Sequence, residues 1–159
     1  MKTKILVVTF FLCTVLTGKA FSFGLGAQFN FKAGEVFAPG AALLVSPTRT
    51  TNLAVNWYLD SNKVTTLGIT FDILAIPRSP RGGLNFTLGG GVYGNTIFDD
   101  EIVVNGGVRL PVGLNVLLIR NVFEIFAHVA PSVGVSFIPS LEFTKPFFPV
   151  AVGARVWFN

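Results

Sequence analysis

The sequence is poor in the residues that most enzyme and metal sites need. It contains one histidine, His128, and one cysteine, Cys13. A disulfide framework or a cysteine–histidine metal site needs several such residues, so both are excluded. Charged residues make up 13% of the chain, with 12 lysines and arginines against 8 acidic residues, and the basic residues form no cluster. The composition therefore gives no support for nucleic-acid binding.

The first twenty residues differ from the rest of the chain. Lysines precede an apolar run from Ile5 to Leu16, and the small residues Gly18 and Ala20 follow it. This is the pattern of a cleaved secretory signal peptide. The run is also shorter than the roughly 20 residues that a membrane-spanning helix needs. We therefore predict that residues 1–20 are a cleaved signal peptide and that residues 21–159 form the mature protein.

After residue 20, apolar and polar residues alternate almost to the end of the chain. From Phe21 to Lys32 the odd positions are apolar, and the even positions are small or polar. Strict alternation is typical of a β-strand whose two faces meet different surroundings. The polar face is rich in Gly, Ser, Thr and Asn, which suits a crowded interior better than a solvated exterior. The pattern therefore predicts a membrane β-barrel that turns its apolar face to lipid.

The alternation recurs in eight segments, an even number that fits a closed antiparallel barrel with both ends on one side. We predict an all-β fold, an eight-stranded antiparallel up-and-down transmembrane β-barrel. Aromatic residues of the apolar face gather near the strand ends, as in the girdles of such barrels. Segments 95–101 and 139–146 are predicted to be loops. The predicted strands are Phe21–Lys32, Gly40–Ser46, Asn52–Leu59, Thr66–Ile73, Leu84–Tyr93, Ile102–Leu118, Phe123–Phe137 and Phe148–Phe158.

The last strand carries Gly153, Val156 and Phe158, a glycine followed by apolar residues three and five positions later. This spacing resembles the assembly signal of bacterial outer-membrane barrels. With the leader and the eight strands, the chain resembles the small OmpA, OmpX and OmpW barrels, and segments 108–114 and 123–131 resemble uncharacterised spirochaetal barrels more closely. The resemblance implies a monomer in the bacterial outer membrane, in contact with its lipid. It also implies insertion by the barrel-assembly machinery through the C-terminal strand.

Five titratable residues fall on or near the inward face: Asp72, Arg109, Glu124, His128 and Arg155. An eight-stranded barrel is about wide enough for its own side chains to fill. Two acids and two arginines can neutralise one another there, as buried charges must. We predict a lumen charge network that plugs the barrel, and hence a structural or surface role. The alternative is a narrow, porin-like channel for ions or small solutes, which the resemblance to OmpA-type interiors also implies.

A lipid-modifying barrel enzyme and a secreted lipocalin-like barrel are the two other classes that the pattern brings into question. A lipid-modifying barrel enzyme is a remote alternative, because His128 and Ser132 on one strand are about 13 Å apart, too far for a base–nucleophile hydrogen bond. We therefore predict no enzymatic activity, no cofactor and no metal. A secreted lipocalin-like barrel would instead keep its apolar face inside. Apolar residues assigned to the outer loops, such as Ile97 and Phe143, either cap the barrel mouth or bind an apolar ligand, as the OmpW resemblance implies.

Overall fold

The computed structural model describes residues 22–33, 38–59, 64–76, 83–99 and 101–158. The predicted signal peptide lies outside these residues. Within the described part of the chain, no helix is long and apolar enough to cross a membrane. The strands are β1 (Phe23–Ala33), β2 (Ala38–Ser46), β3 (Thr51–Leu59), β4 (Thr65–Ile76), β5 (Gly83–Phe98), β6 (Ile102–Arg109), β7 (Val112–Leu118), β8 (Phe123–Val129), β9 (Ser132–Ile138) and β10 (Glu142–Phe158).

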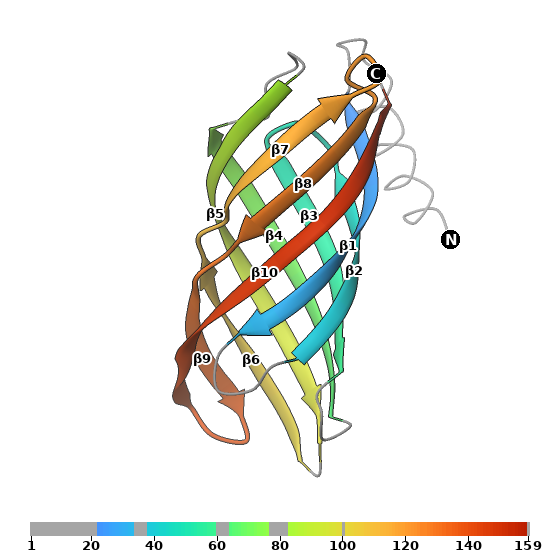
Figure 1. The fold of residues 1–159 in the computed structure, drawn as a ribbon. Coiled ribbons are helices and arrows are strands. Elements are labelled where there is room, and N and C mark those ends of the chain that lie inside the picture. The colour runs from blue at the N-terminus through green and yellow to red at the C-terminus, as the bar shows by residue number, and fades with distance from the viewer. Residues whose placement is uncertain (1–21, 34–37, 60–63, 77–82, 100, 159) are drawn as a thin grey trace, which may run out of the picture.

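The strands form one antiparallel sheet that closes on itself. Strands β1 to β6 pair in chain order, β7 pairs with β5 and β8, β9 pairs with β6 and β10, and β8 also pairs with β10. The sheet closes because β1 pairs with β10 over the full length of β1. Phe23 lies opposite Phe158, so the start of β1 and the end of β10 lie at the same end of the barrel (Figure 1). We call this the terminal end, and the other the distal end. The predicted antiparallel β-barrel is confirmed.

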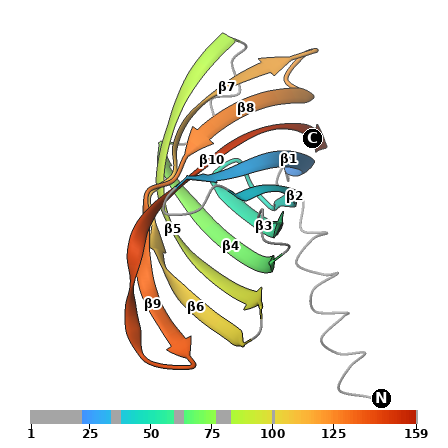
Figure 2. The same ribbon diagram turned by 60° about the horizontal axis from the view of Figure 1, so that its bottom comes forward.

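The ten strands make eight passes, because two predicted strands are each divided in two. Gly91 of β5 lies opposite Arg109 of β6, and Leu88 of β5 lies opposite Val112 of β7. The register is therefore continuous from β6 into β7, across Pro111. Similarly, β9 and β8 both pair with β10 (Figure 2). The structure agrees with the eight passes predicted from the sequence.

Three prolines interrupt neighbouring passes at one level of the barrel. Proline has no N–H to donate, so each removes one hydrogen bond from the sheet. The carbonyl groups of Pro111, Pro131 and Pro149 still accept hydrogen bonds at 2.9 Å, from Gly89, Leu110 and Ala130 respectively. The hydroxyl of Ser132 donates to the Ala130 carbonyl at 2.7 Å, which replaces the bond that Pro149 cannot give. The pairing therefore continues through the interruption.

The two faces of the wall have the predicted chemistry. Along β4, the outward residues are exposed and apolar, whereas the inward residues are buried and mostly small or polar. Val108 is 58% exposed and its neighbour Arg109 only 8%, so one step along the strand moves from the outer face to the lumen. The outward residues of β4 are Leu67, Ile69, Phe71 and Ile73, and the inward ones are Gly68, Thr70, Asp72 and Leu74.

The predicted loops at the distal end were too long. Asn95 to Phe98 belong to β5, where Asn95 pairs with Asn105 and donates a side-chain hydrogen bond to it at 3.3 Å. Likewise β10 begins at Glu142, opposite Ser136 of β9. Turn-forming residues suggested loops there. In the structure, cross-strand pairing extends the first hairpin, and an irregularity between Thr144 and Phe147 accommodates the second.

Candidate functional site in the barrel lumen

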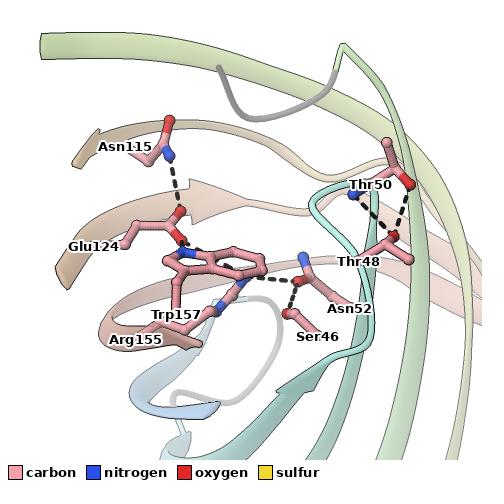
Figure 3. Close-up of polar contacts among 8 residues, drawn as sticks. All are labelled: Ser46, Thr48, Thr50, Asn52, Asn115, Glu124, Arg155 and Trp157. Atoms are coloured by element: carbon pink, nitrogen blue, oxygen red, sulfur yellow. Dashed lines mark hydrogen bonds and ion pairs between the residues drawn. The ribbon is translucent and has the colours of Figure 1, made fainter. Parts of the chain in front are cut away.

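Glu124 of β8 is the centre of a buried group near the terminal end of the lumen (Figure 3). Its side chain has no exposed surface. The indole Nε1 of Trp157 donates to one carboxylate oxygen at 2.6 Å, and Asn115 Nδ2 donates to the other at 2.8 Å. Arg155, opposite Glu124 in the register of β8 and β10, forms an ion pair with it at 3.8 Å. We call these four residues and Asn52 the inner cluster.

Arg155 links Glu124 to the far wall of the barrel. Its guanidinium donates to Asn52 Oδ1 of β3 at 3.0 Å, and the hydroxyl of Ser46 donates to the same oxygen at 2.7 Å. The guanidinium also lies 5.0 Å from the ring centre of Phe126 and 5.3 Å from that of Trp157. Cation–π contacts of this kind stabilise a buried arginine. The inner cluster therefore spans the lumen from β3 to β10.

The turn between β2 and β3 adds a second cation over the inner cluster. The guanidinium of Arg49 lies 4.6 Å from the ring centre of Trp157. Burial lowers the pKa of Arg49, and the negative charge of Glu124 opposes this change. Arginine stays protonated in proteins, so Arg49 retains its charge. The hydroxyl of Thr48 accepts from the backbone N–H of Thr50 at 3.2 Å and holds the turn (Figure 3).

A separate ion pair lies further along the lumen. Arg109 Nε is 3.2 Å from Asp72 Oδ1, and both side chains are buried. Asp72, Gly91 and Arg109 lie at one level on three adjacent passes, so the pair must meet across Gly91. A Cβ at Gly91 would collide with the Asp72 carboxylate. The glycine therefore leaves the space in which the two charges meet.

Two small cavities lie in the lumen, and the Asp72–Arg109 pair connects their walls. The inner cavity has a volume of about 20 Å³ and includes Asp72 in its lining. The outer cavity has a volume of about 10 Å³ and includes Arg109. The polar lining of the inner cavity is Asn52, Asp72, Thr87, Asn115, Glu124, His128 and Arg155. The polar lining of the outer cavity is Lys32, Tyr58, Thr66, Tyr93, Asn95, Arg109 and Ser132.

The predicted charge network is divided into two ion pairs. Asp72 is paired with Arg109, and Glu124 with Arg155. The fifth predicted residue, His128, lines the inner cavity, and its ring is stacked on Phe126 with centroids 5.9 Å apart. Ser132 lines the outer cavity. The histidine and serine therefore belong to different cavities.

The residues of the predicted assembly signal all lie in β10. Gly153 faces the lumen side, where a Cβ would collide with the Ala27 carbonyl and the ring of Phe126. Val156 and Phe158 are exposed on the outer face. The Phe158 ring lies 6.3 Å from that of Phe23 across the β1–β10 pair. The two apolar positions of the motif therefore lie beside the junction that closes the barrel.

The sequence reasoning missed most of the uncharged partners in the lumen. Trp157 faces the lumen from β10, and its indole N–H donates a hydrogen bond to the Glu124 carboxylate. The sequence did offer a signal for this inward tryptophan, because Trp157 lies between the outward residues Val156 and Phe158 and must therefore face the lumen. Tyr93 is another inward aromatic side chain, placed in register with Gly107 and Gly134 of the next two passes. These two glycines leave room for its ring.

Comparison with known proteins supports the fold. No protein-family model and no curated protein matches the chain. Its structure is similar to the N-terminal β-barrel domain of OprF from Pseudomonas aeruginosa, with a TM-score of 0.57 and 15% identity over 85% of this chain and 97% of that one. It is also similar to Neisserial surface protein A, NspA, with a TM-score of 0.53 and 14% identity over 88% of this chain and 98% of that one.

Proposed function

We propose that this protein is an integral outer-membrane barrel with a closed polar lumen and a structural or surface role. The observation that carries the proposal is the contrast between the two faces of the wall. Apolar side chains are exposed around the outside, while Glu124, Arg155, Asp72 and Arg109 are buried and paired inside. Lipid is the surrounding that makes an apolar exterior favourable. The leader, residues 1–20, supplies the export that this location requires.

Cell fractionation and gel mobility test the location and the fold together. The mature protein should begin at Phe21 and be recovered with outer-membrane fragments. Unboiled protein should migrate differently from boiled protein in detergent gels, because a closed barrel resists detergent until it is heated. Recovery from the soluble periplasmic fraction, with one mobility before and after boiling, would contradict the proposal.

A narrow channel is the second candidate, and the two cavities favour it. They lie in the lumen on either side of the Asp72–Arg109 pair, and both have polar linings. With volumes of about 20 and 10 Å³, each cavity has room for about one water molecule, so any path through them is interrupted. Planar-bilayer recording from the refolded protein separates the candidates. A near-silent membrane supports the plug, whereas large and steady conductance supports the channel.

A further inference from the structure

A groove on the outer wall of the barrel is far larger than either cavity in the lumen. It has a volume of about 630 Å³ and crosses β10, β1, β2 and β3, which lie side by side in the wall (Figure 1). Pockets that hold small molecules usually have a volume of about 300–1,000 Å³. Every outward side chain that lines this groove is apolar. We call it the wall groove.

Three alanines form the floor of the wall groove. Ala154 lies opposite Ala27 in the register of β10 and β1. Ala41 of β2 is one step diagonally from Ala27, because it lies opposite Phe29. A methyl group is shorter than the side chains around it, so the three alanines leave a diagonal depression in the wall. Ala27 lies near the middle of β1, so the depression begins at mid-wall.

Bulky side chains form the two banks and the distal end of the wall groove. Phe29 is 70% exposed and Leu43 is 71% exposed, and they stand on opposite sides of the line from Ala27 to Ala41. Trp57 of β3 lies opposite Ala41, two residues before the distal end of its strand. The wall groove therefore leads from mid-wall to a tryptophan near the distal edge of the apolar surface.

The position of the wall groove selects its occupant. The groove opens on the outer face, where the surrounding medium of a membrane barrel is lipid hydrocarbon. An apolar site does not hold ordered water, and an empty one loses dispersion contacts along its lining. A flexible acyl chain can follow the diagonal floor. A second barrel fits less well, because Phe29 and Leu43 project and keep a rigid, convex wall away from the alanines.

We propose that the wall groove binds one acyl chain of a membrane phospholipid whose headgroup lies beside Trp57. The chain lies over Ala41 and Ala27, with its methyl end toward Ala154. A tryptophan suits the headgroup end, because its ring is apolar and its N–H can donate to a polar group at the boundary. This inference rests on the proposed function, since the wall groove meets lipid only in a membrane barrel.

Fluorescence quenching by phosphatidylcholine with brominated chains, added to the protein in detergent micelles, provides the first test. The chain has two tryptophans, and Trp157 is buried in the lumen, so lipid bromine should quench Trp57. Trp57→Phe measures the background. Binding at a site should saturate, and bromine near the carboxyl end of the chain should quench more than bromine near the methyl end. Quenching in simple proportion to the lipid content of the micelle, or the reverse order of the two lipids, would overturn the proposal.

Two leucine variants assign the quenching to the wall groove. Ala27→Leu fills the floor without adding a polar group. It should move half-maximal quenching to about tenfold more lipid, which corresponds to the loss of roughly ten carbon–carbon contacts. Ala127→Leu makes the same change on the outer face of β8, outside the groove, and should bind lipid as the wild type does. Both variants are first checked for the heat-dependent gel mobility of a folded barrel. Identical quenching curves for Ala27→Leu and the wild type would exclude this site.

Native mass spectrometry of the protein extracted from membranes provides the second test. One phospholipid should remain on the wild type and on Ala127→Leu, and it should be lost from Ala27→Leu. A lipid-free dimer that Ala27→Leu dissociates would show that a second copy covers the groove, and would overturn the proposal. A heat-modifiable barrel in the outer membrane that retains no phospholipid would remove the acyl-chain site and leave the proposed function intact.

Discussion

The two halves of the lumen satisfy their buried charges in different ways. In the inner cluster, Glu124 interacts with Trp157, Asn115 and Arg155, so its two carboxylate oxygens both have partners. We call the part of the lumen around the outer cavity the outer half. There, the Asp72–Arg109 pair lies beside a cavity lined by hydrogen-bond donors, and the Tyr93 hydroxyl has no partner among the described residues. The carboxylate at the centre of the inner cluster therefore has partners on both oxygens, although Asn115 Oδ1 and Arg155 Nε have no hydrogen-bond partner among the described residues.

This difference indicates two different contributions to the barrel. A buried charge whose hydrogen-bond partners come from several strands fixes the arrangement of those strands. The inner cluster includes residues from β3, β7, β8 and β10, so it ties together passes that are not neighbours. In the outer half, Asn95 and Ser132 donate hydrogen bonds to Asn105 and to the Ala130 carbonyl, while the Tyr93 hydroxyl has no partner among the described residues. We therefore expect substitutions in the inner cluster to affect folding more than those in the outer half.

The largest effect is expected when Glu124 is truncated. Glu124→Ala would leave Arg155 as a buried cation and remove the acceptor for Trp157 and Asn115. Removing one partner of a buried ion pair typically costs about 3–5 kcal/mol. Urea titrations of the protein refolded into lipid vesicles measure this loss.

A matched substitution keeps that test specific. Glu142→Ala removes a carboxylate that is exposed at the start of β10, and it should change the free energy of unfolding very little. Equal stability of the two variants would show that the inner cluster does not hold the barrel together, and the contrast between the halves of the lumen would fail.

A second prediction tests the orientation of the wall, on which both halves depend. Val108→Arg places a charge on the outer face, where it should cost about 2–4 kcal/mol if the residue lies near the middle of the bilayer. Asn105→Arg places the same side chain on the lumen side, where water can reach it from the distal mouth. Vesicle refolding compares the two. Equal tolerance of both arginines would mean that the faces are wrongly assigned.

The glycine beside Val108 offers a related control. A Cβ at Gly107 would collide with the backbone of Val133 and Gly134 on the next pass. Gly107→Val should therefore impair folding in detergent as well as in lipid, since the collision is within the protein. Val108→Arg, by contrast, should impair folding mainly in lipid. This difference between solvents separates a packing defect from a membrane effect.

The sequence predicted the faces of the strands well, because alternation depends only on local backbone geometry. It predicted which charges face inward for the same reason. It did not predict which charges meet, because that depends on the register between strands. Glu124 and Arg155 pair because β8 and β10 align them, and Asp72 reaches Arg109 because Gly91 lies between them. Neither fact can be read from single-strand patterns.

The errors at the distal end have a physical cause as well. Asn95 favours turns in isolation, and Glu142 lies in a segment bounded by Pro139 and Pro146, so the sequence suggested loops around both residues. In the structure, both belong to strands because a neighbouring strand supplies hydrogen-bond partners for their backbone. Cross-strand pairing therefore outweighs local preference. The same limit explains why Trp157, in a segment recognised as a strand, was not identified as a partner of Glu124.

A third prediction asks which half of the lumen closes the path. Arg155→Ala removes a buried side chain that spans the inner cluster, and water must enter to solvate Glu124. We expect single-channel conductance to rise above a near-silent wild type, with a fall in thermal midpoint. Arg109→Ala is the matched variant in the outer half. If neither variant conducts, the barrel remains structural and neither ion pair acts as its gate.

The smallest effect is expected at Ser132, in the outer half. Its hydroxyl donates a hydrogen bond to the Ala130 carbonyl. Pro149, which lies opposite, cannot donate to this carbonyl because proline lacks an N–H. Ser132→Ala should therefore cost about 1 kcal/mol, the net worth of one buried hydrogen bond. Thr87→Val in the inner cavity, for which no side-chain hydrogen bond is seen among the described residues, is the comparison and should cost less. A loss in Ser132→Ala as large as that in Glu124→Ala would mean that the interrupted passes, and not the inner cluster, limit the stability of the barrel.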